Sequence, residues 1–214
     1  MLAPWVIDEM KTAELNDKRL DDRLRVVLSQ LAAHPTASIP AACGGRAEME
    51  AAYRLFDNDK VTFDNILQPH QETTRQRIAA QPVVILAQDT TEIDLTRPEQ
   101  QVQGSGPLDD SDRRGALLHL LHAFTPDGTP LGTVQATAWA RDEGPSIRQT
   151  LSKVERATRP LEEKESYRWV VALRAAQEEA QRNPANADDL RRNKGVRNQI
   201  QYWFLTRMAL PGIF

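Results

Sequence analysis

The chain has 214 residues, of which 40% are hydrophobic and 27% charged, a composition that is ordinary for one large globular domain or two small ones. No apolar run approaches the roughly 20 residues of a membrane-spanning helix, and the N-terminus MLAPWVIDEMK lacks the pattern of a signal peptide. We therefore expect a cytoplasmic protein with no membrane partner. The single cysteine, Cys43, excludes an internal disulfide and a cysteine-cluster zinc site.

The first 80 residues predict helices. Leucine and valine residues recur at helical spacing over residues 17–34, with a capping Asn16 or Asp17 before them. A short helix should follow Ser38 and close at Gly44-Gly45, a further helix should span about 46–57, and Pro69 should begin the next one. The whole segment 1–80 is expected to form one helical domain.

The segment 46–57 is a candidate DNA-binding helix, because two helices joined across Gly44-Gly45 resemble a helix-turn-helix. Its apolar side chains repeat at i, i+3, i+4 and i+7, and the expected core stripe is Met49, Ala52, Tyr53 and Phe56. The expected outer face consists of Ala47, Ala51, Arg54 and Asn58, with Arg46 at its margin.

Three of these outer residues, Arg46, Arg54 and Asn58, can donate hydrogen bonds to phosphates or to the edges of bases. The alternative is a helical hairpin with an ordinary polar face. Glu48 and Glu50 favour that alternative, because phosphate attraction supplies much of the affinity of DNA-binding proteins.

The periodicity changes after residue 81. The run VVILAQD is typical of a strand buried on both faces, and the segments GALLHLLHAFT and TPLGTVQATAWA should be two more strands that flank a turn at Pro126-Asp127-Gly128. Residues 162–182 predict a helix whose inward stripe is Trp169, Leu173, Ala176 and Ala180. Residues 83–140 are thus expected to form three antiparallel strands, with the helix packed on them.

Asp89 should stand at the end of the first strand, where a carboxylate could hold Mg²⁺ or could simply cap a turn. If the strand continues, the odd offset places Asp94 on the opposite face from Asp89. His119 and His122 are also at an odd offset, so we expect no metal shared between them.

Four sequence blocks together resemble the N-terminal part of bacterial cut-and-paste transposases of the insertion-sequence type, whose catalytic triad is Asp, Asp, Glu. The blocks are SIPAACGGRAEMEAAYRLFDN, PVVILAQDTTEIDL, LHAFTPDGTPLG and EEKESYRW. The resemblance implies an α+β or α/β chain, with a helical domain at 1–80 that binds double-stranded DNA at transposon ends. A partial ribonuclease-H-like domain is implied at 81–183, and a divergent tail at 184–214.

The same resemblance makes Asp89 the first catalytic ligand of Mg²⁺. The blocks that carry the other two carboxylates have no clear counterpart, and the nearest alignment of the second one falls on residues 206–210, TRMAL. We therefore expect a truncated transposase that holds Mg²⁺ weakly. The alternatives are an inhibitor that associates with full-length transposase, a pseudogene product, and an enzyme that completes its site with Glu162 or Glu165.

Residues 184–199 are rich in positive charge and poor in periodicity, so we expect them to be poorly ordered.

Overall fold

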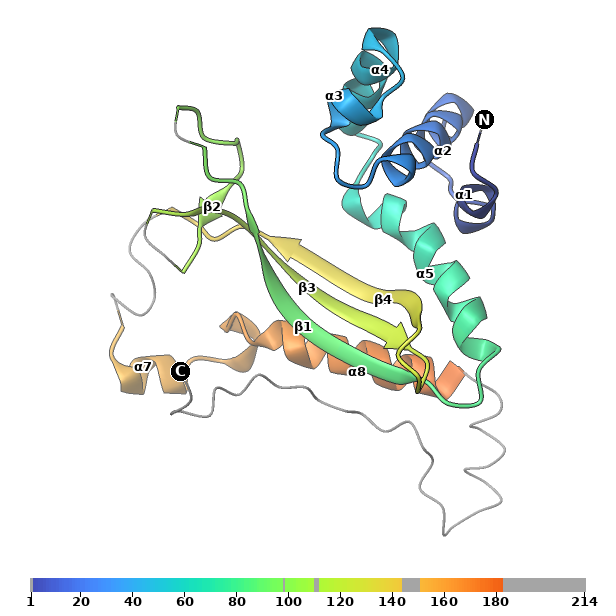
Figure 1. Ribbon diagram of the computed structural model, residues 1–214. Helices are drawn as coiled ribbons and strands as arrows, with labels where there is room; N and C mark the ends of the chain where they lie inside the picture. Colours follow the sequence, from blue (N-terminus) through green and yellow to red (C-terminus); the bar gives the residue numbers. More distant parts are fainter. Residues whose placement is uncertain (1, 98, 110–111, 144–150, 183–214) are drawn as a thin grey trace. The chain divides into compact units, whose positions relative to one another are not determined.

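The computed structural model describes residues 2–97, 99–109, 112–143 and 151–182 of the chain. These residues form two compact units, Met1–Arg77 and Ile78–Phe214, each with its own core (Figure 1). Helices make the first unit, and an antiparallel sheet with helices makes the second, so the chain is an α+β protein. The tail expected at 184–214 lies outside the described residues, and so does the segment 184–199 that is expected to be poorly ordered.

Five helices begin in the helical unit: α1 (Pro4–Glu9), α2 (Lys18–Ala33), α3 (Ile39–Ala42), α4 (Arg46–Phe56) and α5 (Phe63–Ala79). The helix predicted over residues 17–34 is confirmed as α2, which Asp17 caps by accepting a hydrogen bond from the Arg19 N–H at 2.9 Å. All five helices contribute residues to the core of the unit or pack against it, and its most buried members are Val6, Leu15, Leu24, Val27, Ala52 and Leu55.

Helix α5 differs from the prediction, because Pro69 lies inside it and does not begin it. The helix starts at Phe63, after a reciprocal pair of hydrogen bonds. The Thr62 hydroxyl accepts from the backbone N–H of Asn65, and the side-chain Oδ1 of Asn65 accepts from the backbone N–H of Thr62. Proline has the φ angle of a helix and forfeits one backbone hydrogen bond. Because Pro69 is fully buried, packing of its ring offsets that loss.

The sheet unit contains β1 (Ile85–Asp94), β2 (Gly106–Pro107), β3 (Arg114–Phe124) and β4 (Pro130–Trp139). Strand β3 is central and pairs antiparallel with each of the others, which confirms the three long antiparallel strands that the sequence predicts. The predicted turn is also confirmed, with Gly128 at a φ of 89° between β3 and β4.

Helix α8 (Tyr167–Arg182) lies along one face of this sheet (Figure 1), where Ala172 and Ala176 join a core with Leu86 and Leu121. The predicted helix was placed too early, because residues 161–163 form the short 3-10 helix η1 (Leu161–Glu163), after α7 (Lys153–Thr158). The buried side chains of α8 are Ala172, Ala176 and Glu179. Of the expected inward stripe, only Ala176 is among them.

Candidate nucleic-acid interface and the Asp89 strand

Helix α4 packs on the helical unit through a side that only partly matches the one that the sequence predicts. Ala52 and Leu55 are its buried residues, at 0% and 1% exposure, whereas Tyr53 and Phe56 are 46% and 44% exposed. The expected core stripe is therefore confirmed for Ala52 and for the half-buried Met49, and wrong for Tyr53 and Phe56. Glu48 also lies towards the neighbouring helix, because its carboxylate accepts a hydrogen bond from Arg23 of α2.

The start of α4 depends on a glycine. Gly45 precedes the first helical residue with a φ of 152°, a backbone conformation that residues with a Cβ rarely adopt. The Arg23–Glu48 contact and the burial of Leu55 fix which side of α4 is exposed.

The exposed side of α4 includes two of the three predicted DNA-binding residues. Arg54 is exposed, and we find no hydrogen bond or ion pair for it among the described residues. Arg46 is also exposed, but its Nε donates to Glu50 Oε1 at 2.8 Å, so that its charge is partly neutralised.

Asn58 lies beyond the end of the helix, and its role is local. Its side-chain Oδ1 accepts a hydrogen bond of 3.0 Å from the Lys60 N–H, which closes the turn between α4 and α5. The structure thus places Arg46 and Arg54 together on one helix, with Asn58 in the turn that follows it.

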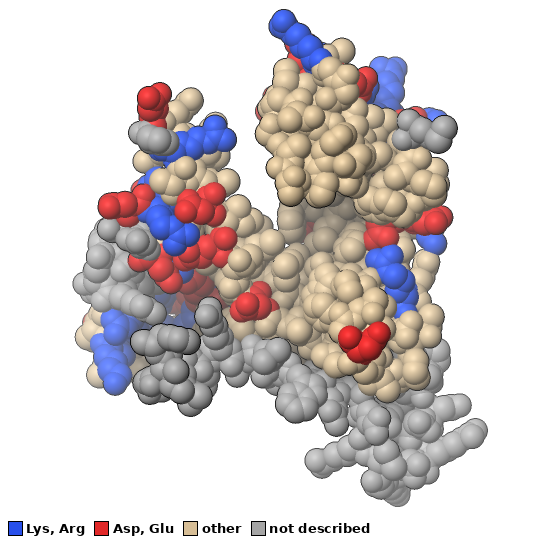
Figure 2. All heavy atoms as spheres, in the orientation of Figure 1, with Lys and Arg blue, Asp and Glu red and all other residues tan. Residues whose placement is uncertain are grey.

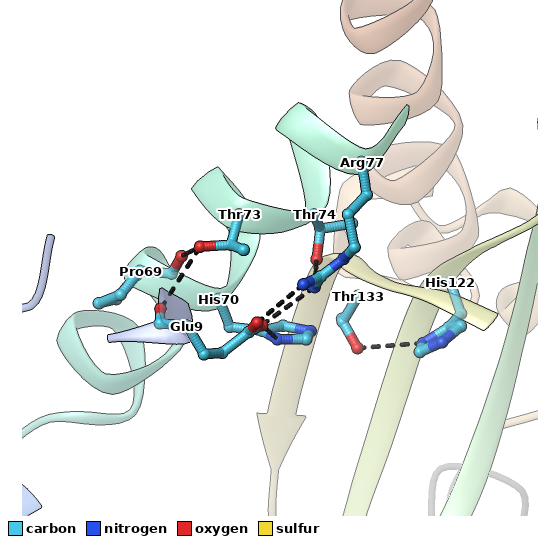
Figure 3. Close-up of polar contacts among 8 residues, drawn as sticks. All are labelled: Glu9, Pro69, His70, Thr73, Thr74, Arg77, His122 and Thr133. Atoms are coloured by element: carbon cyan, nitrogen blue, oxygen red, sulfur yellow. Dashed lines mark hydrogen bonds and ion pairs between the residues drawn. The ribbon is translucent and has the colours of Figure 1, made fainter. Parts of the chain in front are cut away.

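A buried carboxylate in α1 fixes α5 to the helical unit (Figure 3). Glu9 is 8% exposed, and its two oxygens accept hydrogen bonds of 2.8 and 3.0 Å from Arg77 of α5. His70 Nδ1 also contacts this carboxylate. Burial by itself would raise the pKa of Glu9, but the hydrogen bonds from Arg77 and His70 outweigh it and hold the pKa below its usual value. Sequence patterns do not reveal this cluster, because residues 61 to 68 positions apart give no local pattern.

In the sheet unit, Asp89 does not end its strand as the sequence suggests. Strand β1 continues to Asp94, and Asp89 lies in its middle, opposite Leu120 of β3. Its carboxylate is exposed and accepts a hydrogen bond of 2.8 Å from the N–H of the next residue, Thr90. Asp89 and Asp94 lie at an odd offset in one strand, so their side chains lie on opposite faces of the sheet.

The two neighbours of Asp89 point to the other face, where both contact a buried histidine. His119 of β3 is 0% exposed; its Nδ1 lies 2.7 Å from Thr90 Oγ1 and its Nε2 lies 3.1 Å from Gln88 Oε1. The His119 ring also packs on Trp169 of α8, with 4.9 Å between ring centroids. Burial lowers the pKa of His119, the Asp89 charge opposes that shift, and the Arg168 charge adds to it.

His122 follows at an odd offset and lies on the opposite face of the sheet, as the sequence predicts. Its Nδ1 is 3.1 Å from the Thr133 hydroxyl of β4. The two histidines of β3 therefore take part in separate contacts.

The other acidic residues of β1 are engaged by one arginine. Arg113 contacts Glu92 at 2.9 Å and Asp94 at 3.0 Å. Hydrogen bonds from Thr96, and then from Arg113, lower the pKa of Asp94 to about 2. Among the described residues, no three His, Cys, Asp or Glu side chains gather as metal ligands, around Asp89 or elsewhere.

Glu165, a suggested substitute ligand, is held at the beginning of α8 by other groups. Arg141 donates to it from Nε and Nη2 at 3.0 and 2.9 Å, and Trp139 Nε1 donates at 2.9 Å. Arg141 also contacts Asp109 at 2.7 Å, and the guanidinium of Arg168 lies 3.7 Å from the Trp139 ring centroid. Figure 2 shows basic and acidic side chains crowded together around this end of the sheet unit, near β2.

The other substitute, Glu162, is exposed on η1. Helix α8 covers the face of the sheet that carries Gln88 and Thr90, and Glu165 immediately precedes this helix. Asp89 projects from the other face, because side chains alternate along a strand. Glu165 is therefore not placed to share a cation with Asp89.

Residues 2–61, which include α1 to α4, match the family model described as transposase DNA-binding. No curated protein matches the chain. Within the described ranges, no helix is both long and apolar enough to cross a membrane. The match and the exposed arginines of α4 support a transposase-family DNA-binding protein.

Proposed function

We propose that this chain binds double-stranded DNA at transposon ends, through the exposed side of α4. The match of residues 2–61 to a transposase DNA-binding model carries the proposal, because it covers the whole of α4 and the helices that support it. Arg54 supplies an exposed guanidinium that can donate two hydrogen bonds to a phosphate or to a guanine. Because the DNA of a bacterial cell lies in its cytoplasm, we also propose a cytoplasmic location for the chain.

The binding proposal is tested with purified full-length chain and a fluorescent duplex of the transposon end, followed by anisotropy at low and at moderate salt. If the transposon end is not known, a duplex enriched by the chain from a random-sequence library takes its place. Saturable binding supports the proposal if unlabelled specific duplex displaces the labelled duplex more effectively than random duplex does. Equal competition by both duplexes would reduce it to non-specific attraction.

The sheet unit supports a second part of the proposal, a ribonuclease-H-like domain of the Asp-Asp-Glu transposase type. Three antiparallel strands with α8 on one face suit the first half of such a domain, and the resemblance assigns Asp89 as its first metal ligand. Among the described residues, no three His, Cys, Asp or Glu side chains gather as potential metal ligands. We therefore propose that the chain binds Mg²⁺ weakly and does not cleave DNA by itself.

DNA binding without DNA cleavage favours a regulatory role as the second candidate function. A chain that occupies the transposon end without cutting it would exclude an active transposase from that DNA. Added chain should then inhibit cleavage by a full-length transposase that uses the same ends, and the inhibition should disappear in Arg54→Ala. Inhibition that is unchanged in Arg54→Ala would point instead to direct association with the enzyme.

A further inference from the structure

Two aromatic side chains of α4 are exposed although the helix has a well-packed buried side. Tyr53 and Phe56 are 46% and 44% exposed, whereas the smaller Ala52 and Leu55 fill the core contact at 0% and 1%. We find no hydrogen bond to the Tyr53 hydroxyl among the described residues. The largest apolar surfaces of this helix therefore lie on its accessible side, next to Arg54.

The spacing of the two rings suits stacked base pairs. Residues three apart in a helix are neighbours on its surface and lie about 4.5 Å apart along its axis. Successive base pairs in duplex DNA are about 3.4 Å apart. One helix in the major groove can thus place Tyr53 and Phe56 against adjacent base pairs.

The charge of the helical unit makes such apolar contacts important. Residues 1–77 contain 10 Lys and Arg against 12 Asp and Glu, so the unit has no excess of positive charge with which to attract phosphates. In Figure 2, few charged side chains cover the visible face over α3 and α4. Specific binding must then draw more than usual on contacts with the bases.

We propose that Tyr53 and Phe56 determine sequence specificity by packing against the C5-methyl groups of thymines in the major groove. This inference rests on the proposed DNA binding and names the base chemistry that α4 recognises. Thymine presents the one methyl group in the groove, and apolar side chains contact it directly. Arg54 would supply the charged contact, to guanine or to phosphate, at the neighbouring position.

The test uses full-length chain and a duplex that it enriches from a random-sequence library. Each thymine of that duplex is replaced in turn by deoxyuridine, which removes the methyl group and keeps base pairing. We expect one or two positions at which the replacement weakens binding about fourfold, the effect of removing one buried methyl-sized group. At those positions Tyr53→Ala or Phe56→Ala should bind the thymine and deoxyuridine duplexes equally.

Trp5→Ala is the matched control, because Trp5 is an exposed aromatic residue of α1 at 50% exposure. It should retain wild-type affinity and the full effect of deoxyuridine. Circular dichroism melting of each variant separates lost contacts from lost folding, and Tyr53→Phe, which keeps the ring, should bind like the wild type.

The outcomes separate this inference from the proposed function. No enrichment of any duplex by the wild-type chain would contradict DNA binding itself. Enrichment without an effect of deoxyuridine, or an equal effect in the wild type and in both alanine variants, would contradict only the role of the two rings. Tighter binding to a duplex with an unpaired base, lost in Tyr53→Ala, would show stacking on a base and would also overturn the methyl contact.

Discussion

Arg77 of α5 and Glu9 of α1 face each other through two hydrogen bonds of 2.8 and 3.0 Å, with the carboxylate almost buried. The pair joins residues 68 positions apart and fixes the helix that continues into the sheet unit. A buried carboxylate is costly unless it is paired, so this contact makes the position of α1 depend on α5.

Glu9→Gln should lower the free energy of unfolding of the helical unit by about 1.5–3 kcal/mol, the size of a hydrogen bond to a charged group. The change removes the charge that Arg77 and His70 contact and keeps the side-chain volume. Urea unfolding followed by circular dichroism measures it. Lys18→Gln, which breaks an exposed pair with Asp22, is the control and should change stability little. Equal effects of the two changes would show that the Glu9 cluster contributes no more to the free energy of unfolding than an exposed ion pair does.

The stability of the sheet unit should fall as the pH drops below about 6.5, the ordinary pKa of histidine. Burial lowers the pKa of His119 in the folded chain, so the unfolded chain binds more protons between the two pKa values. The stabilisation is fully present above the unfolded pKa and is lost as the pH falls towards the folded one. Thermal melting between pH 8 and pH 5 measures this loss.

The control for this pH dependence is a pair of variants. His119→Gln should flatten the change in melting temperature, whereas His34→Gln, at an exposed position, should keep it. An unchanged pH profile in His119→Gln would mean that other groups cause the acid sensitivity.

Asn58→Ala should reduce stability more than it reduces DNA affinity. The Asn58 side chain bonds the Lys60 N–H, so its loss should cost about 0.5–1.5 kcal/mol of folding free energy. Urea unfolding and DNA titration of the same variant compare the two effects. A loss of DNA affinity as large as that of Arg54→Ala, without a loss of stability, would return Asn58 to the DNA-contacting residues.

Asp89→Ala should not change strand cleavage, because we expect none in the wild-type chain. The assay incubates chain and labelled transposon-end duplex with Mg²⁺, with Mn²⁺ and with a chelator. Cleavage that needs metal and disappears in Asp89→Ala would contradict the proposed loss of catalysis. Glu162→Gln and Glu165→Gln would then identify which glutamate completes the site.

Periodicity predicted the elements in which one face is uniformly apolar. Helix α2 and the strands β3 and β4 follow it, because most side chains on their buried faces are leucine, valine or alanine, with His119 of β3 as the polar exception. In α4 the pattern held for Met49 and Ala52 but failed for the two aromatic residues, which are exposed while Leu55 fills the core contact.

Buried polar residues also explain why the predicted end of β1, at Asp89, was wrong. The strand continues through polar residues, and Gln88 and Thr90 can face the interior because His119 bonds both of them. A hydrogen-bond partner 29 to 31 residues away leaves no trace in a local pattern. The arginines of α4 could be named from the sequence as donors, but only the packed structure shows that Glu50 engages Arg46 and leaves Arg54 accessible.

The central claim, that the chain binds DNA through the exposed side of α4, is tested most directly by the affinity of Arg54→Ala for the specific duplex. Anisotropy titration should show binding weakened by about 1–3 kcal/mol relative to the wild type, with unchanged circular dichroism. Lys18→Ala, at an exposed position on α2, should bind like the wild type. Equal affinities of the wild type and Arg54→Ala for that duplex would contradict the claim.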